Sequence, residues 1–237
     1  MKRTISILLS IAALVAASSC TFVRFNDKAF SSAKGDVVKA SSESSTNTYT
    51  VPQFTGIEAH IAADIIYNMT GGDPTVTVEA PENYLEHLVF DVEDGVLKVE
   101  FDDNRKYSSS SKIRITASSA TLESLTISGA GDFKSLAGID AESMKVVIIG
   151  AGDVDIDGLR CAGDVEVSVS GAGDIDMRGL SCRNAKVVVT GAGDVDLAGK
   201  ADSADLSIAG AGDIDIRELE VENVSSSVAG VGKIRRK

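Results

Sequence analysis

The chain has 237 residues, with 35 acidic against 23 basic side chains and a formal net charge of −12. Nucleic acids and anionic membrane surfaces both require a basic footprint, so this charge balance makes them poor partners. Tryptophan is absent and aromatic residues make up only 5% of the chain, so few side chains are available to stack on sugar rings.

The first residues have the pattern of a secretory signal peptide. A basic start, Met1-Lys2-Arg3, is followed by an apolar run from Ile5 to Ala17 that is too short to cross a bilayer as a helix. Ala17-Ser18-Ser19 then precede Cys20, which is similar to the lipobox of bacterial lipoproteins, except that Ala17 stands where leucine is usual. We therefore predict a signal peptide over residues 1–19 and a lipid on Cys20 that anchors the protein in the cell envelope, at the outer membrane. A plain secretory signal cleaved near the same place is the alternative.

Residues 20–50 are rich in Ser, Thr and Ala and have no sustained apolar periodicity. This composition predicts a flexible tether that holds the folded part away from the membrane. An irregular first strand through Val37 and Val38 is the alternative. Loss of residues 1–19 removes two basic residues and leaves 21 basic against 35 acidic ones, a charge of −14.

Short segments in which apolar and polar residues alternate begin after Pro52, and they indicate β-strands. Turn-forming residues separate them at 71–74 and 93–95, and one helical turn is predicted at 81–88, where proline comes first and acidic residues follow. We predict that residues 51–117 form strands that begin the stack of repeats described next. They would cover its first open end, because a bare terminal coil exposes its core and unpaired backbone.

The two histidines of the chain, His60 and His87, fall in this N-terminal third. They lie in different segments, and neither has a second His or a Cys at metal-ligand spacing. We interpret His60 as a solvated strand residue and His87 as a helix-end residue.

The rest of the chain is organised by one four-residue motif, Gly-Ala-Gly-Asp. It begins at Gly129, Gly150, Gly171, Gly191 and Gly210, and a degenerate copy begins at Gly230, with spacings of 19 to 21 residues. So short and regular a period is typical of a solenoid, in which each coil buries its apolar side only against its neighbours. A leucine-rich repeat has a similar period, but its Leu-x-x-Leu-x-Leu pattern is missing.

Apolar residues alternate with polar ones on both sides of each motif, which is the period of a β-strand. We expect the residues two and four before the first glycine, and four and six after it, to point inward. The sequence thus predicts an all-β, right-handed, parallel β-helix-like solenoid of about six coils, each with two short strands joined by the glycine turn. Residues 118–237 would hold the repeats, and with the cap at 51–117 they would form a single domain, 51–237.

The chain also resembles a known family, the bacterial cell-surface domain called the putative auto-transporter adhesin head, or GIN, domain. The resemblance depends on the Gly-Ala-Gly-Asp-(Val/Ile)-Asp copies, on Phe54-Thr55-Gly56-Ile57 and on residues 92–99 (Val-Glu-Asp-Gly-Val-Leu-Lys-Val), and it covers about residues 51–237. It implies a β-helix-like stack in a lipid-anchored or secreted protein, with adhesion as the inferred role. The family has no established catalytic or binding residues to transfer to this sequence.

Nine aspartates recur at two fixed positions of the repeat, three and five residues after the first glycine. They are Asp132, Asp153, Asp174, Asp194 and Asp213 at the first position, and Asp155, Asp176, Asp196 and Asp215 at the second. Both positions have outward parity, so we expect two ladders of carboxylates about 4.8 Å apart, which repel by roughly 0.9 kcal/mol per pair in water. This repulsion would suit a Ca²⁺ ion, although we favour aspartates that accept hydrogen bonds from turn N–H groups and a solvated second column. No other cofactor is predicted.

Cys161 and Cys182 occupy the same position in adjacent repeats, so they should be stacked. In an oxidising envelope compartment a disulfide between them is one alternative, but side chains in register lie slightly too far apart for relaxed bridge geometry. We therefore favour two free thiols.

The repeats contain no histidine, so no Ser-His-Asp or Cys-His set can be assembled within them. Basic residues such as Arg160, Arg178 and Lys186 are interpreted as scattered, away from the aspartate ladders. These observations favour a non-catalytic cell-surface lipoprotein, an adhesin or envelope structural module that presents a repetitive acidic surface to an envelope or host glycan or protein. The alternative is a glycan-processing β-helix enzyme, similar to polysaccharide lyases and hydrolases.

Overall fold

The computed structural model of the chain describes residues 37–103, 105–108 and 112–237. The predicted signal peptide, Cys20 and residues 21–36 of the predicted tether lie outside these ranges. Within them, regular structure consists of strands and one helical turn, α1 (Glu82–Leu85), at the predicted position. No described helix is long and apolar enough to cross a membrane.

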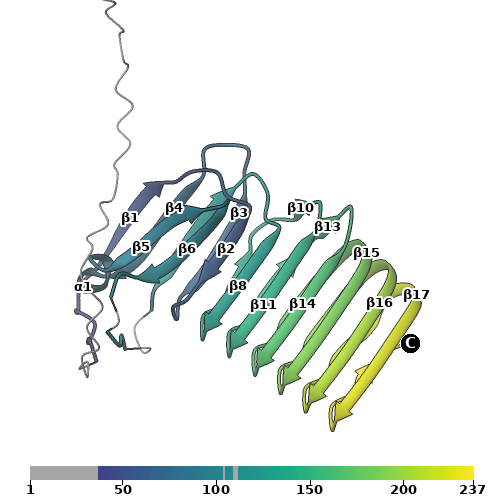
Figure 1. Cartoon of the computed structure of the whole chain (residues 1–237). Coiled ribbons are helices and arrows are strands. Elements are labelled where there is room, and N and C mark those ends of the chain that lie inside the picture. Colours follow the sequence, from purple (N-terminus) through teal and green to yellow (C-terminus); the bar gives the residue numbers. More distant parts are fainter. Residues whose placement is uncertain (1–36, 104, 109–111) are drawn as a thin grey trace, which may run out of the picture. The chain divides into compact units, whose positions relative to one another are not determined.

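Stacked coils form a parallel β-solenoid, which confirms the predicted fold class (Figure 1). Each coil has three sides, where the sequence predicted two strands. The side before the motif consists of β2 (Gly56–Ala59), β8 (Ser124–Gly129), β11 (Met144–Gly150) and β14 (Val165–Gly171). The side after the motif consists of β3 (Asp64–Met69), β9 (Phe133–Ser135) and β12 (Val154–Asp157). The third side is short and is formed by β10 (Ile139–Ala141) and β13 (Leu159–Cys161).

In the later coils the three sides run together as one long strand that bends around the stack. These strands are β15 (Ile175–Gly191), β16 (Val195–Gly210) and β17 (Ile214–Gly230), and the short β18 (Ile234–Arg235) follows. Successive copies of the motif lie directly above one another, since Gly150 is the register partner of both Gly129 and Gly171. The sequence period therefore equals one turn of the solenoid.

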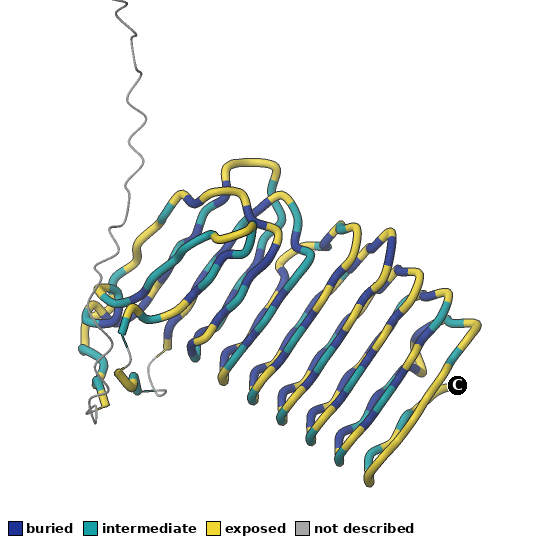
Figure 2. Tube along the Cα trace, viewed as in Figure 1, coloured by how far each residue is buried: buried dark blue, intermediate teal, exposed yellow. Residues whose placement is uncertain are grey.

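The side chains predicted to point inward are buried in all repeats but the last, and they form one continuous core. In the last coil Val228 is 44% exposed and Ser226 is exposed as well. Figure 2 shows this change as the exposed stretch of β17 at the end of the row of buried strands. Among the described residues, β17 has a parallel partner on its outer edge only where β18 pairs with Ile214 and Asp215.

The predicted capping segment contributes two coils of its own to the stack. β2 pairs in parallel with β8 on one side and with β6 (Val96–Phe101) on the other. β3 lies in the same way between β9 and β7 (Arg114–Ser119). The coil that comes first in the chain therefore stands inside the stack, and its turn, Ile61-Ala62-Ala63-Asp64, lacks both motif glycines.

Antiparallel strands then cover the end of the stack. β5 (Leu88–Glu93) pairs with β6, β4 (Thr75–Pro81) pairs with β7, and β1 (Ser44–Thr50) pairs with β4. The ordered domain therefore begins before residue 51, and the last part of the predicted tether is the edge strand of the cap. Val38 forms a β-bridge with Tyr107, which agrees with the alternative of irregular strand structure at Val37 and Val38.

Close approach of neighbouring coils explains both glycines of the motif. At Gly171 φ is +143°, and a Cβ atom would lie 2.0 Å from the carbonyl oxygen of Gly150. At Gly173 φ is outside the positive range, yet a Cβ atom would lie 2.2 Å from the carbonyl oxygen of Gly152. The turn conformation thus requires the first glycine, whereas stacking alone requires the second.

This packing predicts that Gly171→Ala lowers the free energy of unfolding by about 3 kcal/mol or more, because the added methyl group forces two coils apart. Gly71→Ala is the matched control, since a Cβ atom at Gly71 meets nothing within 4 Å. Urea unfolding followed by circular dichroism measures both variants. Equal midpoints for the two would contradict the stacking explanation.

Candidate functional site

The side of the solenoid after the motif carries the nine predicted aspartates, and we call this surface the acidic wall. None of the nine is buried, and the members of the second column are register partners on adjacent strands. The predicted outward facing of both columns is therefore confirmed. The two columns differ in how their negative charge is satisfied.

In the first column, each carboxylate accepts a hydrogen bond from the backbone of the next coil. The N–H of Asp153 donates to Oδ1 of Asp132 with an N to O distance of 3.1 Å. The contact repeats at 3.1, 2.8 and 2.7 Å for the N–H groups of Asp174, Asp194 and Asp213. Lys233 completes the series, its N–H donating to Oδ1 of Asp213 at 2.7 Å. This geometry supports the favoured interpretation, but the N–H group belongs to the neighbouring coil.

The second column is flanked by basic side chains of the same wall. Nζ of Lys134 lies 2.8 Å from Oδ2 of Asp155, and Arg178 forms an ion pair with Asp176. Nε of Arg217 lies 2.9 Å from Oδ2 of Asp215, and these hydrogen bonds lower the pKa of Asp215. The interpretation of Arg178 as remote from the aspartates was therefore wrong. Arg178 lies two residues after Asp176 on β15, so both side chains point to the same face of the sheet.

Asp196 is the exception within the two columns. Among the described residues it has neither a hydrogen bond nor an ion pair, and Ala198 stands where the adjacent coils have Arg178 and Arg217. Partial burial, followed by the charges of Asp215 and Asp176, raises the pKa of Asp196. The surroundings of this carboxyl group therefore favour its protonated form.

A depression of about 400 Å³ surrounds Asp196, and we call it the wall groove. Its lining includes Asp176, Arg178, Asp196, Ala198, Asp215 and Arg217. Carboxylates accept hydrogen bonds and guanidinium groups donate them in a fixed fork. The groove can therefore pair with both the hydrogen and the oxygen of hydroxyl groups on a ligand.

A larger depression of about 990 Å³ lies at the exposed end of the solenoid. Its lining includes Leu219, Val221 and Val224 of β17, together with Arg236 and Lys237. Asp205, Glu220 and Glu222 line it as well, so this end carries both acidic and basic side chains.

Cys161 and Cys182 are free, buried thiols on the third side, in adjacent coils as predicted. Burial raises the pKa of Cys161 to about 12 and that of Cys182 to about 11. Both are therefore protonated at neutral pH, where only the thiolate form would act as a nucleophile or metal ligand.

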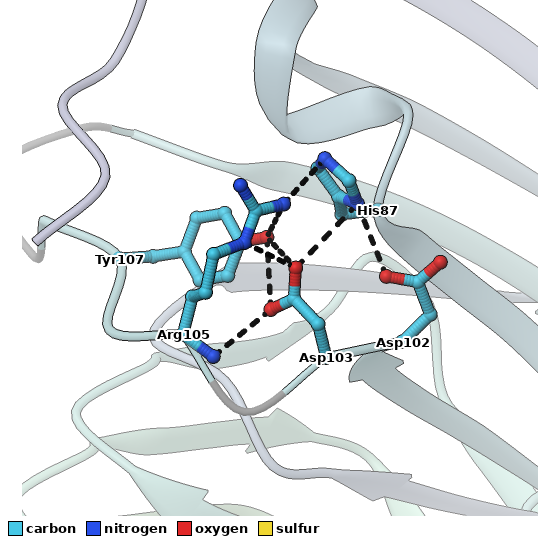
Figure 3. Close-up of polar contacts among 5 residues, drawn as sticks. All are labelled: His87, Asp102, Asp103, Arg105 and Tyr107. Atoms are coloured by element: carbon cyan, nitrogen blue, oxygen red, sulfur yellow. Dashed lines mark hydrogen bonds and ion pairs between the residues drawn. The ribbon is translucent and has the colours of Figure 1, made fainter. Parts of the chain in front are cut away.

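Five polar side chains converge at the capped end, and we call them the cap cluster: His87, Asp102, Asp103, Arg105 and Tyr107 (Figure 3). His87 precedes β5 and Asp102 follows β6, and the N–H of Asp102 donates to the carbonyl oxygen of His87 at 2.8 Å. Nδ1 of His87 lies 3.1 Å from Oδ1 of Asp102 and 3.6 Å from Oδ2 of Asp103. The β5–β6 hairpin therefore brings a histidine and two carboxylates to one point.

Arg105 and Tyr107 hold the other side of the cap cluster. Nη2 of Arg105 lies 2.6 Å from Nε2 of His87, and the hydroxyl group of Tyr107 donates to Oδ2 of Asp103 at 3.0 Å. Burial alone would raise the pKa of Asp103, but hydrogen bonds from the backbone and side chain of Arg105 and from Tyr107 outweigh it and lower this pKa. Burial and the neighbouring Asp103 raise the pKa of Tyr107.

The two histidines lie where the sequence placed them. His60 is exposed and contacts one carboxylate, with Nε2 at 2.8 Å from Oε1 of Glu58. His87 follows the end of α1, its N–H donating to the carbonyl oxygen of Tyr84 at 3.0 Å, and its half-buried ring also belongs to the cap cluster, which the sequence did not predict. The pair of adjacent aspartates after a predicted strand and hairpin was the available signal.

The comparisons with known proteins identify a family. Residues 53–236 match the family model described as "Putative auto-transporter adhesin, head GIN domain". No curated protein matches the chain in sequence.

Solved structures share the fold over most of the chain. A structure described as a putative adhesin from Bacteroides fragilis NCTC 9343 is 24% identical, with a TM-score of 0.67, covering 84% of this chain and 100% of its own. A structure described as a putative lipid binding protein from Parabacteroides distasonis ATCC 8503 is 19% identical, with a TM-score of 0.68, and the match covers 85% of this chain and 100% of that one. A putative adhesin from Parabacteroides merdae ATCC 43184 is also 19% identical, with a TM-score of 0.55, and the match covers 86% of this chain and 100% of that one. At these identities the likeness shows the fold.

The hydrogen bonds of the first column predict that Asp174→Ala lowers the free energy of unfolding by about 1 kcal/mol, because the N–H of Asp194 loses its acceptor. Asp174→Asn keeps an oxygen acceptor and should lose less. Asp157→Ala is the control, because Asp157 is an exposed aspartate of the same wall whose side chain makes no hydrogen bond or ion pair with any described residue. Urea unfolding with and without millimolar Ca²⁺ measures all three. A Ca²⁺-dependent gain in stability that disappears in Asp174→Asn would contradict a purely hydrogen-bonding role.

Proposed function

The chain belongs to the family of the auto-transporter adhesin head GIN domain, and from this membership we propose that it is a non-catalytic binding module of the cell envelope. Its ligand is a glycan or protein of the envelope or of a host surface, contacted on the acidic wall. Neighbours in structure that are described as adhesins support this assignment, and so does the acidic charge, which disfavours anionic partners.

The observation that carries the proposal is that most carboxylates of the acidic wall already have hydrogen-bond or ion-pair partners within the chain. Eight of its nine carboxylates already bind backbone N–H groups or basic side chains of the same chain, so the wall presents acceptors whose positions are set by the stacked coils. A preformed surface binds without the entropic cost of ordering its side chains. The wall groove at Asp196 is the point at which we place the ligand contact.

Attachment to the membrane through a lipid on Cys20 is part of the proposal. The basic start, the short apolar run and the small residues before Cys20 support it. The outer membrane is the expected location, with the solenoid held away from the bilayer by the residues between Cys20 and the cap.

A glycan-processing enzyme is the second candidate, and one observation favours it. Asp196 has a raised pKa and shares a groove with the carboxyl groups of Asp176 and Asp215, and glycoside hydrolysis uses such a pair of neighbouring carboxyl groups, one as general acid and one as base. The first candidate is preferred because Asp196 is exposed, whereas a carboxyl group that acts as a general acid at neutral pH is generally desolvated.

Lipid attachment predicts that the mature protein has a diacyl or triacyl adduct on Cys20 and partitions with membranes. Cys20→Ala should move it into the soluble fraction, because one cysteine carries the whole anchor. Intact mass and membrane fractionation measure this, with Cys161→Ala as the control. A processed wild-type protein of unmodified mass would overturn the anchor.

Binding on the acidic wall predicts that the Cys20→Ala protein captures a ligand from panels of envelope glycans, host glycans and matrix proteins. The pair Arg178→Gln with Arg217→Gln should weaken that binding at least about tenfold, as the loss of 1.4 kcal/mol implies. Lys145→Gln with Lys186→Gln, which removes two charges from the side before the motif, should leave it unchanged. Thermal melts establish that each variant is folded.

Each outcome of this experiment separates the candidates. Binding without change in the ligand supports the binding module. Cleavage that is lost in Asp196→Asn supports the enzyme instead. Binding that survives the arginine pair would move the contact away from the wall groove.

A further inference from the structure

The cap cluster combines the donor atoms that a transition-metal ion prefers. One imidazole nitrogen and one oxygen from each of two carboxylates lie within 4.8 Å of one another: Nδ1 of His87, Oδ1 of Asp102 and Oδ2 of Asp103. Imidazole selects for Zn²⁺ and its neighbours in the first row, whereas Ca²⁺ and Mg²⁺ take oxygen ligands. Zn²⁺ sites with three protein ligands and a water are common, and carboxylate oxygens are among the ligands that Zn²⁺ accepts.

The separations between the donor atoms fit a small ion. With metal–ligand distances of about 2.1 Å, two ligands of a tetrahedral ion lie about 3.4 Å apart. The observed distances from Nδ1 of His87 are 3.1 Å to Asp102 and 3.6 Å to Asp103. An ion could therefore be accommodated with shifts of a few tenths of an ångström at these two contacts.

The scaffold holds the donor atoms in place before any ion arrives. His87 and Asp102 face each other across the end of the β5–β6 hairpin and are joined by a backbone hydrogen bond. Asp103 is oriented by the hydroxyl group of Tyr107 and by the N–H of Arg105, which donates to Oδ1 at 3.0 Å. Hydrogen bonds of this kind to a ligating carboxylate are usual in metal sites.

Arg105 now supplies the positive charge that an ion would bring. Its Nη2 faces Nε2 of His87 at 2.6 Å, and its Nε lies 2.5 Å from Oδ2 of Asp103. Arginine can only donate, so Nε2 is an acceptor and neutral His87 carries its proton on Nδ1. Metal on Nδ1 would move that proton to Nε2, where it would face the guanidinium donors and displace Arg105. The Arg105 side chain is 44% exposed and is free to move into solvent.

From this geometry we propose that the cap cluster is a binding site for a divalent transition-metal ion, with Zn²⁺ held by Nδ1 of His87 and one oxygen each of Asp102 and Asp103. Arg105 is an internal competitor for the site. The ion would fix the turn after β6 to the start of β5. That turn leads into residues 105–108, on which Val38 is held: its N–H donates to the carbonyl oxygen of Lys106 at 2.7 Å, and its own carbonyl accepts from Ser108 at 3.1 Å.

Titration calorimetry with Zn²⁺ alone, on the mature chain with Cys20→Ser after treatment with chelator, tests the proposal. We expect one ion per chain and a rise in melting temperature. His87→Ala should weaken binding by more than about a hundredfold, since loss of an outer hydrogen-bond partner already costs about 10–100-fold. Tyr107→Phe, which removes such a partner, should weaken it by about tenfold, and Arg105→Gln should strengthen it.

Two controls locate the ion. His60→Ala removes the other histidine, which contacts a single carboxylate, and should bind Zn²⁺ as the parent does. Asp174→Asn with Asp176→Asn alters the acidic wall and should also have no effect. Co²⁺ provides a spectroscopic signature, because its visible absorption reports an imidazole and oxygen environment that Asp103→Asn would change.

Several results would overturn the site. Absence of stoichiometric Zn²⁺ binding to the parent chain, binding that persists in His87→Ala, or binding that is lost with the wall aspartates would each do so. Weaker binding in Arg105→Gln would show that the guanidinium group is a partner of the ion and would refute competition. Failure of glycan or protein capture would leave this proposal untouched, since the cap cluster and the acidic wall share no residue.

Discussion

The close stacking of backbones is the constraint on which the rest of this structure depends. Parallel strands of neighbouring coils lie about 4.8 Å apart, and at the motif the carbonyl oxygen of one coil fills the space where a side chain of the next would begin. At Gly150 and Gly212 that oxygen is 2.0 Å from the position of a Cβ atom. Only glycine fits there, so both glycines return once per coil through the repeats, and the spacing of the motif equals the length of chain in one coil.

The aspartate after the second glycine follows from the same stacking. With the turns superposed, a short carboxylate reaches the N–H of the next coil at a fixed offset, and a ladder that would repel itself becomes a line of hydrogen bonds. The degenerate last copy of the motif shows that the requirement for glycine and the requirement for aspartate are separate. It keeps both glycines, since it stacks on the preceding coil, but has Lys233 in place of aspartate. Lys233 still donates its backbone N–H to Oδ1 of Asp213.

The features predicted correctly from the sequence are those that recur in each repeat, and the features missed occur once in the chain. Burial of Val146, Val167 and Val187 could be predicted because the alternation of apolar and polar residues is visible within a single strand. The place of the β2–β3 coil inside the stack depends on pairing with β6 and β8, far along the chain, and its turn has Ala62-Ala63 where later turns have Ala-Gly. The cap cluster was missed for the same reason. His87 and Asp102 are 15 residues apart and meet only through the hairpin register, which no local pattern specifies.

Polar and aromatic side chains that do not repeat along the chain lie together in the cap. Its antiparallel strands do not contain the glycine motif, so their side chains are not limited by the close approach of stacked coils. The rings of Tyr84 and Phe101 pack against that of Tyr107, a member of the cap cluster, while the repeats hold hardly any aromatic residue. The first described residues are bound to the same region. Val38 is held by residues 105–108 and by the hydroxyl group of Tyr84 at 2.9 Å, and Ser41 by Asn83 of α1 at 2.8 Å. In a protein anchored through Cys20, force on the anchor would enter the fold through these hydrogen bonds. Together with the β1–β4 pairing these hydrogen bonds would carry that load, so the proposed attachment would depend on the cap and not on the repeats.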